Sequence, residues 1–516
     1  MQEQLHHSSE TAGLLRSLRA FLSRRRVTAY LVGGVVRDAL IGRPTHDIDL
    51  AVSGDPVRLA ETLATELGGG WVALDQVHQI ARVVLSRGQD KRDSWFVDLA
   101  ALRGAVAEDL AERDFTIDAM AIDLFDPDLL QGRGAVIDPF GGRSDLRDGS
   151  VRAVNPDIFK ADPARLIRAV RLSAELGFSI ESGTASQVKH DAHLLSLVSP
   201  ERVRDELWRI LAAQNATRRL RTLDELGLLT IVIPELEDAR GVQQPREHYW
   251  DVLNHLLETV GAVERALGDG RKNAGKLSTD IPWDSTLEEH FAEEVSVGRN
   301  RLVLLKLAAL LHDIGKPETK TIEPSGRMRF IGHPKLGAEK AIAIMERLRF
   351  SNRETRMVST MVEQHLRPSL INRGEEGPTD RAVYRYYRDC GDVAIDTIFL
   401  SLADYMAARG PMLEQAEDSS ELLQDWRDSV AKRAYLLNAG REKQEVVSPP
   451  KLLTGDDLVN QFGLTPGPLF KQLLEAVREA LAAGEIATKD EALALVRKVL
   501  AESDQRSEGR GNSLAQ

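Results

Sequence analysis

One strand–turn–helix–strand segment near the N-terminus constrains the fold of this chain most strongly. Residues 29–32 form a short apolar run, Gly33 and Gly34 interrupt it, and a later run rich in β-formers contains Asp47 and Asp49. Residues two apart in a strand point to the same face, so both carboxylates would project from one side of a sheet. The segment therefore predicts an α/β region that presents two neighbouring carboxylates.

Two carboxylates on one face suit divalent cations. Two oxygen-liganded Mg²⁺ ions could activate an attacking hydroxyl group and stabilise the leaving pyrophosphate in phosphoryl transfer. Gly33 and Gly34 let the backbone approach a triphosphate closely, and the helix N-terminus with Arg37 favours negative charge. Asp98, in the run from Trp95 to Ala100, is a candidate third carboxylate on a neighbouring strand. The alternative is that these are ordinary solvated aspartates, which are frequent on surfaces.

The composition is that of a globular protein with several domains. The chain has 516 residues, 42% of them apolar and 28% charged, which suggests three or four domains. No apolar run reaches the ~20 residues of a membrane span. The first residues lack the features of a signal peptide, so we expect a cytoplasmic protein without a membrane partner. Cys390 is the only cysteine, which excludes a disulfide framework or a thiolate zinc site within one chain.

The charge distribution bears on nucleic-acid binding. A net charge of -12 argues against a protein that coats nucleic acid over its whole surface. Residues 151–230 differ from the rest, with 12 Lys or Arg against 10 Asp or Glu. This segment is one candidate for RNA contact, although an excess of this size is also compatible with chance.

Changes in hydrophobic periodicity divide the chain into six parts and predict an α+β fold. Strand and helix patterns alternate in the first 150 residues, whereas helical periodicity dominates from Asp162 onward. The expected parts are a leader helix at 1–26, an α/β head at 27–150, a helical neck and body at 151–240, a histidine-containing helical domain at 241–415, a small helical domain at 416–502 and a disordered tail at 503–516.

Three longer motifs follow one another along the first part of the chain. They are LVGGVVRDALIGRPTHDIDLAV at 31–52, EDLAERDFTIDAMAIDL at 108–124 and ADPARLIRAVRLSAELGFSIE at 161–181. In this order they resemble the class II nucleotidyltransferases, the branch that contains bacterial tRNA CCA-adding enzymes and poly(A) polymerases. The resemblance implies a nucleotidyltransferase head that extends an RNA 3′ end without a template.

The resemblance also implies a role for each matching residue. In that family an acidic residue and an arginine of the third motif read the base edge of CTP or ATP. Asp162 and Arg165 lie three apart, so on a helix they would share one face and offer an acceptor and a rigid donor fork. An ordinary surface ion pair is the alternative. The expected residues are Asp47, Asp49 and Asp98 for catalysis, the first two as Mg²⁺ ligands; Gly33, Gly34 and Arg37 for the triphosphate; and Arg113, Asp114, Asp162, Arg165 and Arg168 for the nucleotide.

The chain departs from the family pattern at several positions. Glu112 stands where a second arginine commonly precedes the RDFT element of the second motif, Asp118 replaces a usual asparagine, and Ala161 replaces a frequent acidic residue. Only residues 104–107 precede the second motif where full CCA-adding relatives have a longer flexible loop. This short gap resembles enzymes that add only the two cytidines, so full CCA, CC-only and A-only addition all remain open.

A second set of polar residues lies between 241 and 415. LLHDIGKP at 310–317 places His312 and Asp313 side by side after an apolar helix. Adjacent residues near a helix end can both reach one cation, and imidazole with carboxylate suits a transition metal or Mg²⁺. The segment resembles the HD superfamily, and HYWDVLNHLLETV at 248–260 resembles its opening segment in CCA-adding relatives.

The HD resemblance implies a divalent metal site whose metal the sequence does not select. Such a site lowers the pKa of bound water and produces a hydroxide for phosphoester hydrolysis. A degenerate HD scaffold that only packs against RNA is the alternative. The implied ligands are His255, His312, Asp313 and Asp404, with His333 and His365 supporting a second metal or binding substrate phosphate.

Together the motifs predict addition of CMP and AMP, from CTP and ATP, to the 3′ end of tRNA, combined with an HD phosphohydrolase. Three alternatives remain: a poly(A) polymerase, an HD hydrolase with an RNA-binding head, and an RNA-binding module in which both sites have decayed. The sequence does not predict the oligomeric state.

Overall fold

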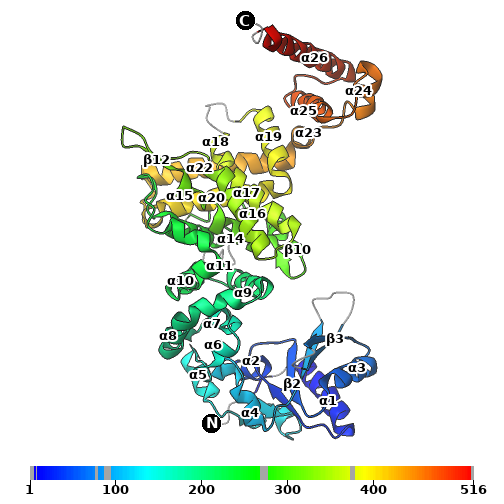
Figure 1. Cartoon of the computed structure of the whole chain (residues 1–516), viewed down its shortest axis with the longest axis vertical. Coiled ribbons are helices and arrows are strands. Elements are labelled where there is room, and N and C mark those ends of the chain that lie inside the picture. The colour runs from blue at the N-terminus through cyan, green and yellow to red at the C-terminus, as the bar shows by residue number, and fades with distance from the viewer. Residues whose placement is uncertain are drawn as a thin grey trace. The chain divides into compact units, whose positions relative to one another are not determined.

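The computed structural model describes residues 5–6, 8–75, 79–86, 94–267, 277–371 and 378–512, with side chains described up to Glu502 (Figure 1). The chain forms two compact units: Met1–Gln214 with Arg218–Val232, and Asn215–Thr217 with Ile233–Gln516. Among the described helices, none combines the length and the apolar character needed to cross a membrane.

A seven-stranded sheet organises the first unit. The strands run in the order β3, β4, β5, β2, β1, β6, β7. β2 pairs with β5 in parallel, and the other described pairs of this sheet are antiparallel. The strands are β1 (Ala29–Val32), β2 (Asp47–Val52), β3 (Gly70–Asp75), β4 (Ile80–Leu85), β5 (Trp95–Ala101), β6 (Ala121–Asp123) and β7 (Val136–Ile137).

Side-chain alternation explains why two central strands carry carboxylates. Ile48 and Leu50 of β2 are buried, and β5 alternates in the same way. The residues between the buried positions therefore lie on the opposite face of the sheet. The parallel register pairs Asp49 with Asp98, so both strands present carboxylates on one face, as the sequence predicts.

Helices cover the sheet and extend the first unit beyond it. α2 packs against β1 and β2, and α3 packs against β3, β4 and β5. The helical pattern expected after residue 162 is present, and one short strand within it, β9, pairs in parallel with β8, which precedes it. The helices are α1 (Ser9–Arg24), α2 (Gly34–Ile41), α3 (Pro56–Leu67), α4 (Val106–Ala111), α5 (Gly142–Asp148), α6 (Ile158–Ala161), α7 (Ala164–Leu176), α8 (Ser182–Asp191), α9 (Pro200–Ala212), α10 (Ala216–Glu225) and α11 (Leu229–Val232), and the strand pair is β8 (Ser150–Val151) with β9 (Ser179–Ile180).

The second unit is built around one almost fully buried helix. Ten of the eleven residues of α14 are buried, and α12, α17 and α20 pack around it. A helix that is apolar on all sides is typical of the centre of a bundle. The helices are α12 (Val252–Leu267), α13 (Ser285–Ala292), α14 (Arg301–Leu311), α15 (Lys316–Thr319), α16 (His333–Arg347), α17 (Asn352–Gln364), α18 (Arg367–Leu370), α19 (Asp380–Cys390), α20 (Ala394–Arg409), α21 (Pro411–Glu414), α22 (Glu421–Glu442), α23 (Gln444–Val447), α24 (Gly455–Phe462), α25 (Pro468–Ala482) and α26 (Lys489–Asn512). Two hairpins accompany them, β10 (Glu294–Ser296) with β11 (Arg299–Asn300) and β12 (Lys320–Ile322) with β13 (Met328–Phe330).

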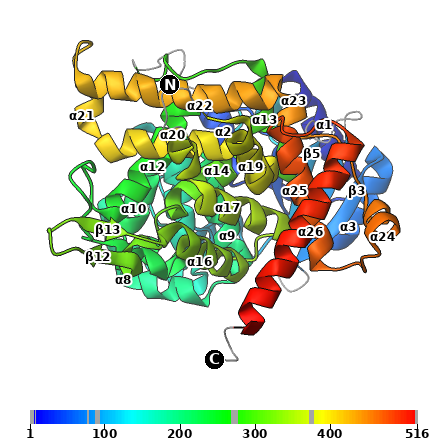
Figure 2. The ribbon, with the colours of Figure 1, turned by 90° about the horizontal axis from the view of Figure 1, so that it is seen from above.

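The last three helices share a small core of their own. Leu458 of α24, Leu473 of α25 and Val496 of α26 are buried together. Figure 2 shows α25 and α26 packed side by side. α26 extends to Asn512 and so runs through most of the segment for which the sequence predicts disorder; residues 513–516 lie outside the described residues.

Candidate active sites

Three aspartates lie on the same face of β2 and β5. Asp49 is opposite Asp98 in the parallel register, and Asp47 lies two residues before Asp49. Arg82 of β4 donates to both carboxylate oxygens of Asp98, through Nε at 2.7 Å and Nη2 at 2.8 Å. Burial raises the pKa of Asp49 to about 6, an effect that Arg113 opposes and the carboxylates of Asp98 and Asp47 reinforce. This carboxylate face therefore concentrates negative charge.

The donor chemistry of the carboxylate face fits divalent cations, because all its donor atoms are oxygens. Its oxygens are spread more widely than those of a closed metal cage. The set is not among the described groups whose ligand atoms all lie within 4.8 Å of one another. The ion pair with Arg82 holds Asp98 on the β4 side.

Gly33 joins the carboxylate face to the second motif. It precedes α2 with a φ of 75°, a conformation that favours glycine. A Cβ at this position would lie 2.6 Å from Nη1 of Arg113 and 3.5 Å from Oδ2 of Asp49. The absence of a side chain thus lets Arg113 and Asp49 approach the same stretch of backbone.

Arg37 is buried and engaged by two carboxylates. Its Nε lies 2.9 Å from Oδ1 of Asp38, and its Nη1 lies 2.6 Å from Oδ1 of Asp118. Burial works against the charge, but Asp118 and Asp38 raise the pKa of Arg37 above its ordinary value. The aspartate that replaces the usual asparagine therefore has a partner, and any contribution of Arg37 to triphosphate binding comes from an ion-paired position.

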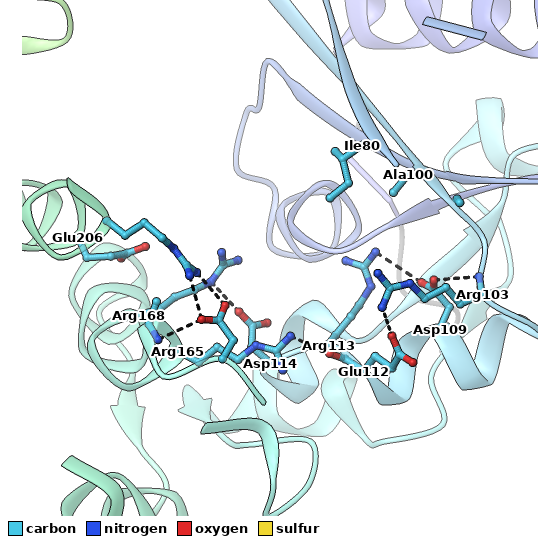
Figure 3. Close-up of a pocket in the computed structure, with 14 residues that line it drawn as sticks. Ile80, Ala100, Arg103, Asp109, Glu112, Arg113, Asp114, Arg165, Arg168 and Glu206 are labelled. Atoms are coloured by element: carbon cyan, nitrogen blue, oxygen red, sulfur yellow. Dashed lines mark hydrogen bonds and ion pairs between the residues drawn. The ribbon is translucent and has the colours of Figure 1, made fainter. Parts of the chain in front are cut away.

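A pocket of about 380 Å³ contains residues of the second and third motifs. Ile80 and Ala100 come from strands, and residues of helices and of the loops beside them, among them Arg113 and Asp114, complete the lining (Figure 3). Nε of Arg168 lies 2.6 Å from Oδ2 of Asp114. Although burial alone would raise it, Arg168 and Arg165 lower the pKa of Asp114. The lining residues are Ile80, Ala100, Ala101, Arg103, Asp109, Glu112, Arg113, Asp114, Asp162, Ala164, Arg165, Arg168, Arg202 and Glu206.

Asp162 does not lie on the helix that carries Arg165, so the expectation of one shared helical face is wrong. α7 begins at Ala164, and Asp162 has an extended backbone with φ -144° and ψ 99°. Pro163 is the physical reason, since the residue before a proline is disfavoured in the α conformation. Both side chains nevertheless line the same pocket.

Separate partners hold these two side chains. Nη1 and Nη2 of Arg202, on α9, lie 3.0 and 2.7 Å from Oδ1 and Oδ2 of Asp162. The backbone N–H of Ala164 donates to Oδ1 of Asp162 at 3.2 Å. Nη2 of Arg165 donates to the carbonyl oxygen of Glu112 at 2.8 Å. Burial opposes the charge of Asp162, but Arg202 lowers its pKa below the ordinary value.

The short segment at 104–107 leads directly into α4. Oε2 of Glu108 accepts a hydrogen bond from the backbone N–H of Ala105 at 2.9 Å. Arg103 and Glu112 form an ion pair that spans the segment and the helix. Glu112, which departs from the family pattern, therefore pairs with the residue that precedes this short segment.

The second unit contains a buried cluster of histidines and aspartates. His255 comes from α12, His312 and Asp313 directly follow α14, and Asp404 comes from α20. Nε2 of His255 lies 3.2 Å from Nε2 of His312 and 3.1 Å from Oδ1 of Asp404. It also lies 3.3 Å from Oδ2 of Asp313. The ligand atoms of all four residues lie within 4.8 Å of one another, so the structure brings together the four expected HD ligands.

His333 and His365 form a second group with the other oxygen of Asp313. Their Nε2 atoms lie 3.2 and 3.6 Å from Oδ1 of Asp313, and these ligand atoms also lie within 4.8 Å of one another. Both Nε2 atoms and this Oδ1 are buried and make no hydrogen bond. Buried polar atoms without partners are uncommon in folded proteins. Asp313 therefore places one oxygen in each of two groups that fit a cation.

Backbone hydrogen bonds orient three of the rings. Nδ1 of His312, of His333 and of His365 lies 2.9, 2.6 and 2.7 Å from the backbone carbonyl oxygen three residues earlier. A proton on Nδ1 leaves Nε2 as the atom that can bind a metal. All three Nε2 atoms face Asp313, so the rings are held in orientations suitable for ligation.

The charges around the cluster are strongly coupled. Burial lowers the pKa of His312, but Asp313 and Asp404 outweigh it and raise the value to about 10. Burial and the neighbouring His312 lower the pKa of His365 to about 3. Histidine binds metals in its neutral form, so a cation would take the place of the His312 proton.

The HD cluster opens onto a pocket of about 550 Å³. Four cationic side chains line it: Lys316, Arg329, Arg409 and Arg433. Nζ of Lys316 lies 2.5 Å from Oδ2 of Asp313. Cationic walls around a metal-ligating cluster favour an anionic substrate.

Among the residues of these sites that were not expected from the sequence, Arg82, Arg202 and Lys316 contact predicted site residues. Lys316 follows Asp313 by three residues, a spacing that could have indicated their contact. Arg82 faces Asp98 because β4 and β5 are antiparallel in that register, which the sequence does not specify. Arg202 lies 40 positions from Asp162, and no local pattern connects the two.

Comparisons with known proteins match three parts of the chain to family models and most of its length to tRNA nucleotidyltransferases. Residues 29–152 match the poly A polymerase head domain, 177–240 the probable RNA and SrmB-binding site of polymerase A, and 285–409 the HD domain. The A-adding tRNA nucleotidyltransferase of Deinococcus radiodurans is 34% identical over 481 residues, which cover 91% of this chain and 95% of that protein. The CC-adding tRNA nucleotidyltransferase of Thermus thermophilus is 31% identical over 475 residues, which cover 91% and 93%.

Solved structures share the fold. A CCA-adding enzyme in complex with ATP matches with a TM-score of 0.61 at 22% identity, over 96% of both chains. The Thermotoga maritima CCA-adding enzyme complexed with tRNA matches with a TM-score of 0.56 at 22% identity, over 96% of this chain and 97% of that one. The fold class and the family expected from the sequence are confirmed. The chain belongs to the tRNA nucleotidyltransferase family, with a poly(A) polymerase head domain and an HD domain.

Proposed function

We propose that the first unit adds CMP and AMP, from CTP and ATP, to the 3′ end of tRNA without a template. The observation that carries the proposal is the junction at Gly33, where Arg113 of the nucleotide pocket and Asp49 of the carboxylate face approach the same backbone. A cation-binding face and a nucleotide pocket thus adjoin within one compact unit. Relatives that align over more than nine-tenths of this chain are named as tRNA nucleotidyltransferases, which supports the same reaction here.

The residues of the carboxylate face have distinct roles in this proposal. Asp47 and Asp49 hold Mg²⁺, and Asp98 supplies a third carboxylate that Arg82 orients. When bound, the ions supply Lewis acidity for the attack of a tRNA 3′-hydroxyl on the α-phosphate and for departure of pyrophosphate. The backbone at Gly33 and Gly34 presents the N-terminus of α2 to the triphosphate, and Arg113 adds positive charge at the same junction.

The pocket selects the base through side chains from two segments. Asp162, before α7, presents a carboxylate acceptor, and Arg165, within α7, presents a donor fork. Arg168 and Asp114 pair at 2.6 Å and position the incoming nucleotide. Because Asp162 and Arg165 line one pocket, they contact one base edge even though they do not share a helical face.

The length of the segment before α4 favours addition of the two cytidines alone over addition of the whole CCA end. The segment at 104–107 is short, which suits CC-only addition. The relatives include both A-adding and CC-adding enzymes.

Three tRNA substrates distinguish these reactions: one lacking the CCA end, one ending after the first C and one ending after both. Full CCA addition extends all three when CTP and ATP are present. A CC-only enzyme leaves the third unextended, and an A-only enzyme extends the third alone. Long A tails on unrelated RNA would instead identify a poly(A) polymerase.

We propose that the second unit hydrolyses phosphoesters with a divalent metal. His255, His312, Asp313 and Asp404 hold one cation, and the orphaned atoms of the group formed by Asp313, His333 and His365 fit a second. Lys316 places its ammonium beside Asp313 and faces the pocket, where it attracts a phosphate. Assaying Asp47→Ala and His312→Ala for both activities tests this proposal. Each variant should lose one activity and keep the other; loss of both in either variant contradicts two independent sites.

A further inference from the structure

We infer that Arg202 is a positioning residue that fixes Asp162 as a single ionised acceptor and so makes the pocket prefer bases with an amino group to bases with a carbonyl group. This role rests on the proposed transferase function and names a residue that sets its specificity. Arg202 reaches the pocket from α9, a different element from the two segments that carry the base-reading residues.

The hydrogen bonds of Asp162 leave one acceptor site free. An ionised carboxylate has about four lone-pair sites. Oδ1 accepts from Nη1 of Arg202 at 3.0 Å and from the backbone N–H of Ala164 at 3.2 Å, and Oδ2 accepts from Nη2 of Arg202 at 2.7 Å. A single site on Oδ2 remains for a ligand. The bidentate contact also fixes the plane of the carboxylate and therefore the direction of that site.

The free site discriminates by hydrogen-bond polarity. The N4 amino group of cytosine and the N6 amino group of adenine donate, whereas the O6 of guanine and the O4 of uracil or thymine accept. An amino group would complete the hydrogen bonding of Oδ2. A carbonyl oxygen would face another acceptor and leave both oxygens without a partner, which is costly in a desolvated contact.

Arg202 preserves this polarity in two ways. It orients the carboxylate, and it favours the ionised form of Asp162, in agreement with the lowered pKa of that group. A protonated or rotated carboxyl group would be able to donate to a carbonyl oxygen. Arg165 is held independently, by the carbonyl oxygen of Glu112, so loss of Arg202 should affect mainly the acceptor side of base reading.

The ion pair is suited to a test of specificity because it is partly exposed. The Arg202 side chain is 57% exposed and the Asp162 side chain 33%. Exposed ion pairs contribute little to stability, so removing Arg202 should leave the fold intact. Arg133 offers a matched control: its side chain is 55% exposed, and it pairs at 3.5 Å with Asp128 in the same unit, outside the residues that line the pocket.

The experiment measures kcat/KM for single nucleotides with the full-length protein and Mg²⁺. CTP and UTP are compared on tRNA lacking the CCA end, and ATP and GTP on tRNA ending in CC. Arg202→Ala should reduce the preference for CTP over UTP, or for ATP over GTP, by about 10- to 100-fold. Arg202→Lys keeps the charge but not the two-pronged contact and should fall between that variant and the wild type. Arg133→Ala should retain the wild-type preference.

The outcomes separate this inference from the proposed function. A wild-type protein that adds no nucleotide to any tRNA overturns the proposed function itself. If the wild type is active and Arg202→Ala keeps the same preference for CTP over UTP and for ATP over GTP, the proposed role of Arg202 is overturned. This holds whether the variant adds nucleotides faster or more slowly than the wild type. If Arg202→Ala adds neither nucleotide, Arg202→Lys decides: a wild-type preference in that variant also overturns the inference.

Discussion

The two candidate sites handle concentrated charge in different ways. In the first unit, Asp98, Asp114 and Asp162 each pair with an arginine. In the second unit, histidines and aspartates pack against one another, and the Nε2 atoms of His333 and His365 are buried without hydrogen bonds. Ion-paired side chains can exchange partners when a substrate arrives, whereas buried ligands held by backbone hydrogen bonds are preorganised. Under the proposed functions, Mg²⁺, nucleotide and tRNA complete the first site, and a divalent metal completes the preorganised second site.

Among the substitutions that distinguish the two sites, Asp49→Asn should have the largest effect on activity. Removing one charge from the carboxylate face should lower nucleotide incorporation by roughly 10³-fold, because the cations lose a ligand while the fold is retained. Phosphoester hydrolysis by the second unit should not change. Incorporation and hydrolysis are measured on the same preparation, with the exposed Asp128→Asn as control. An equal loss of nucleotide incorporation and of hydrolysis would contradict the claim that the two sites act independently.

Gly33→Ala should have the next largest effect. The new Cβ would lie 2.6 Å from Nη1 of Arg113, and displacing that guanidinium should lower kcat/KM for the nucleotide by about 10²-fold. The positive φ should also cost about 1–2 kcal/mol of the free energy of unfolding. Both quantities are measured, by single-nucleotide kinetics and by denaturant unfolding.

Gly391→Ala is the matched control for that substitution. Gly391 has φ 56° and ψ -130°, close to the φ 75° and ψ -138° of Gly33, and a Cβ added there would meet no side chain or backbone atom of another segment within 4 Å. It should therefore show the loss of stability without the loss of incorporation. Equal loss of incorporation in both variants would mean that backbone strain, and not the clash with Arg113, is responsible.

The next prediction is that metal binding stabilises the second unit. A divalent cation at about 100 times its dissociation constant should add about 2.7 kcal/mol to the free energy of unfolding. The measurement is hydrogen exchange of α12, α14 and α20 in chelator-treated protein before and after metal addition. His365→Ala removes a ligand from one group only, so it should reduce this protection without abolishing it. Unchanged exchange with every divalent metal would contradict a metal-completed cluster.

The smallest effect is expected from Pro163→Ala. Without the proline, Asp162 can adopt the α conformation and join α7, which turns its carboxylate away from Arg202. The preference for CTP over UTP should fall, by less than in Arg202→Ala, and single-nucleotide kinetics measure it. Pro56→Ala, at the first turn of α3, is the control and should leave the preference unchanged. A preference that is identical in all three proteins would show that the backbone at Asp162 does not orient the acceptor.

Local patterns in the sequence were sufficient for many of these features. Alternation of apolar and acidic residues predicts that Asp47 and Asp49 share a face, and apolar runs predict the positions of β1, β2 and β5. The order of histidines and aspartates predicted the HD ligands that the structure brings together. These features depend on residues that are close in sequence, or on the order in which a family's characteristic residues occur along the chain.

Features that depend on tertiary pairing were not predictable in the same way. The contact of Arg82 with Asp98 needs the antiparallel register of β4 and β5, and the contact of Arg202 with Asp162 needs the packing of α7 against α9. The helical placement of Asp162 failed for a local reason, since Pro163 already marked that residue as non-helical.

The most direct test of two separate sites is nucleotide addition by the wild type and Asp47→Ala to the three tRNA substrates, with hydrolysis measured in parallel. We expect the wild type to add two C residues from CTP alone to tRNA lacking CCA, and a terminal A from ATP to tRNA ending in CC. Asp47→Ala should add nothing and still hydrolyse phosphoesters. A wild type that hydrolyses phosphoesters but extends none of the three substrates would contradict a transferase site in the first unit.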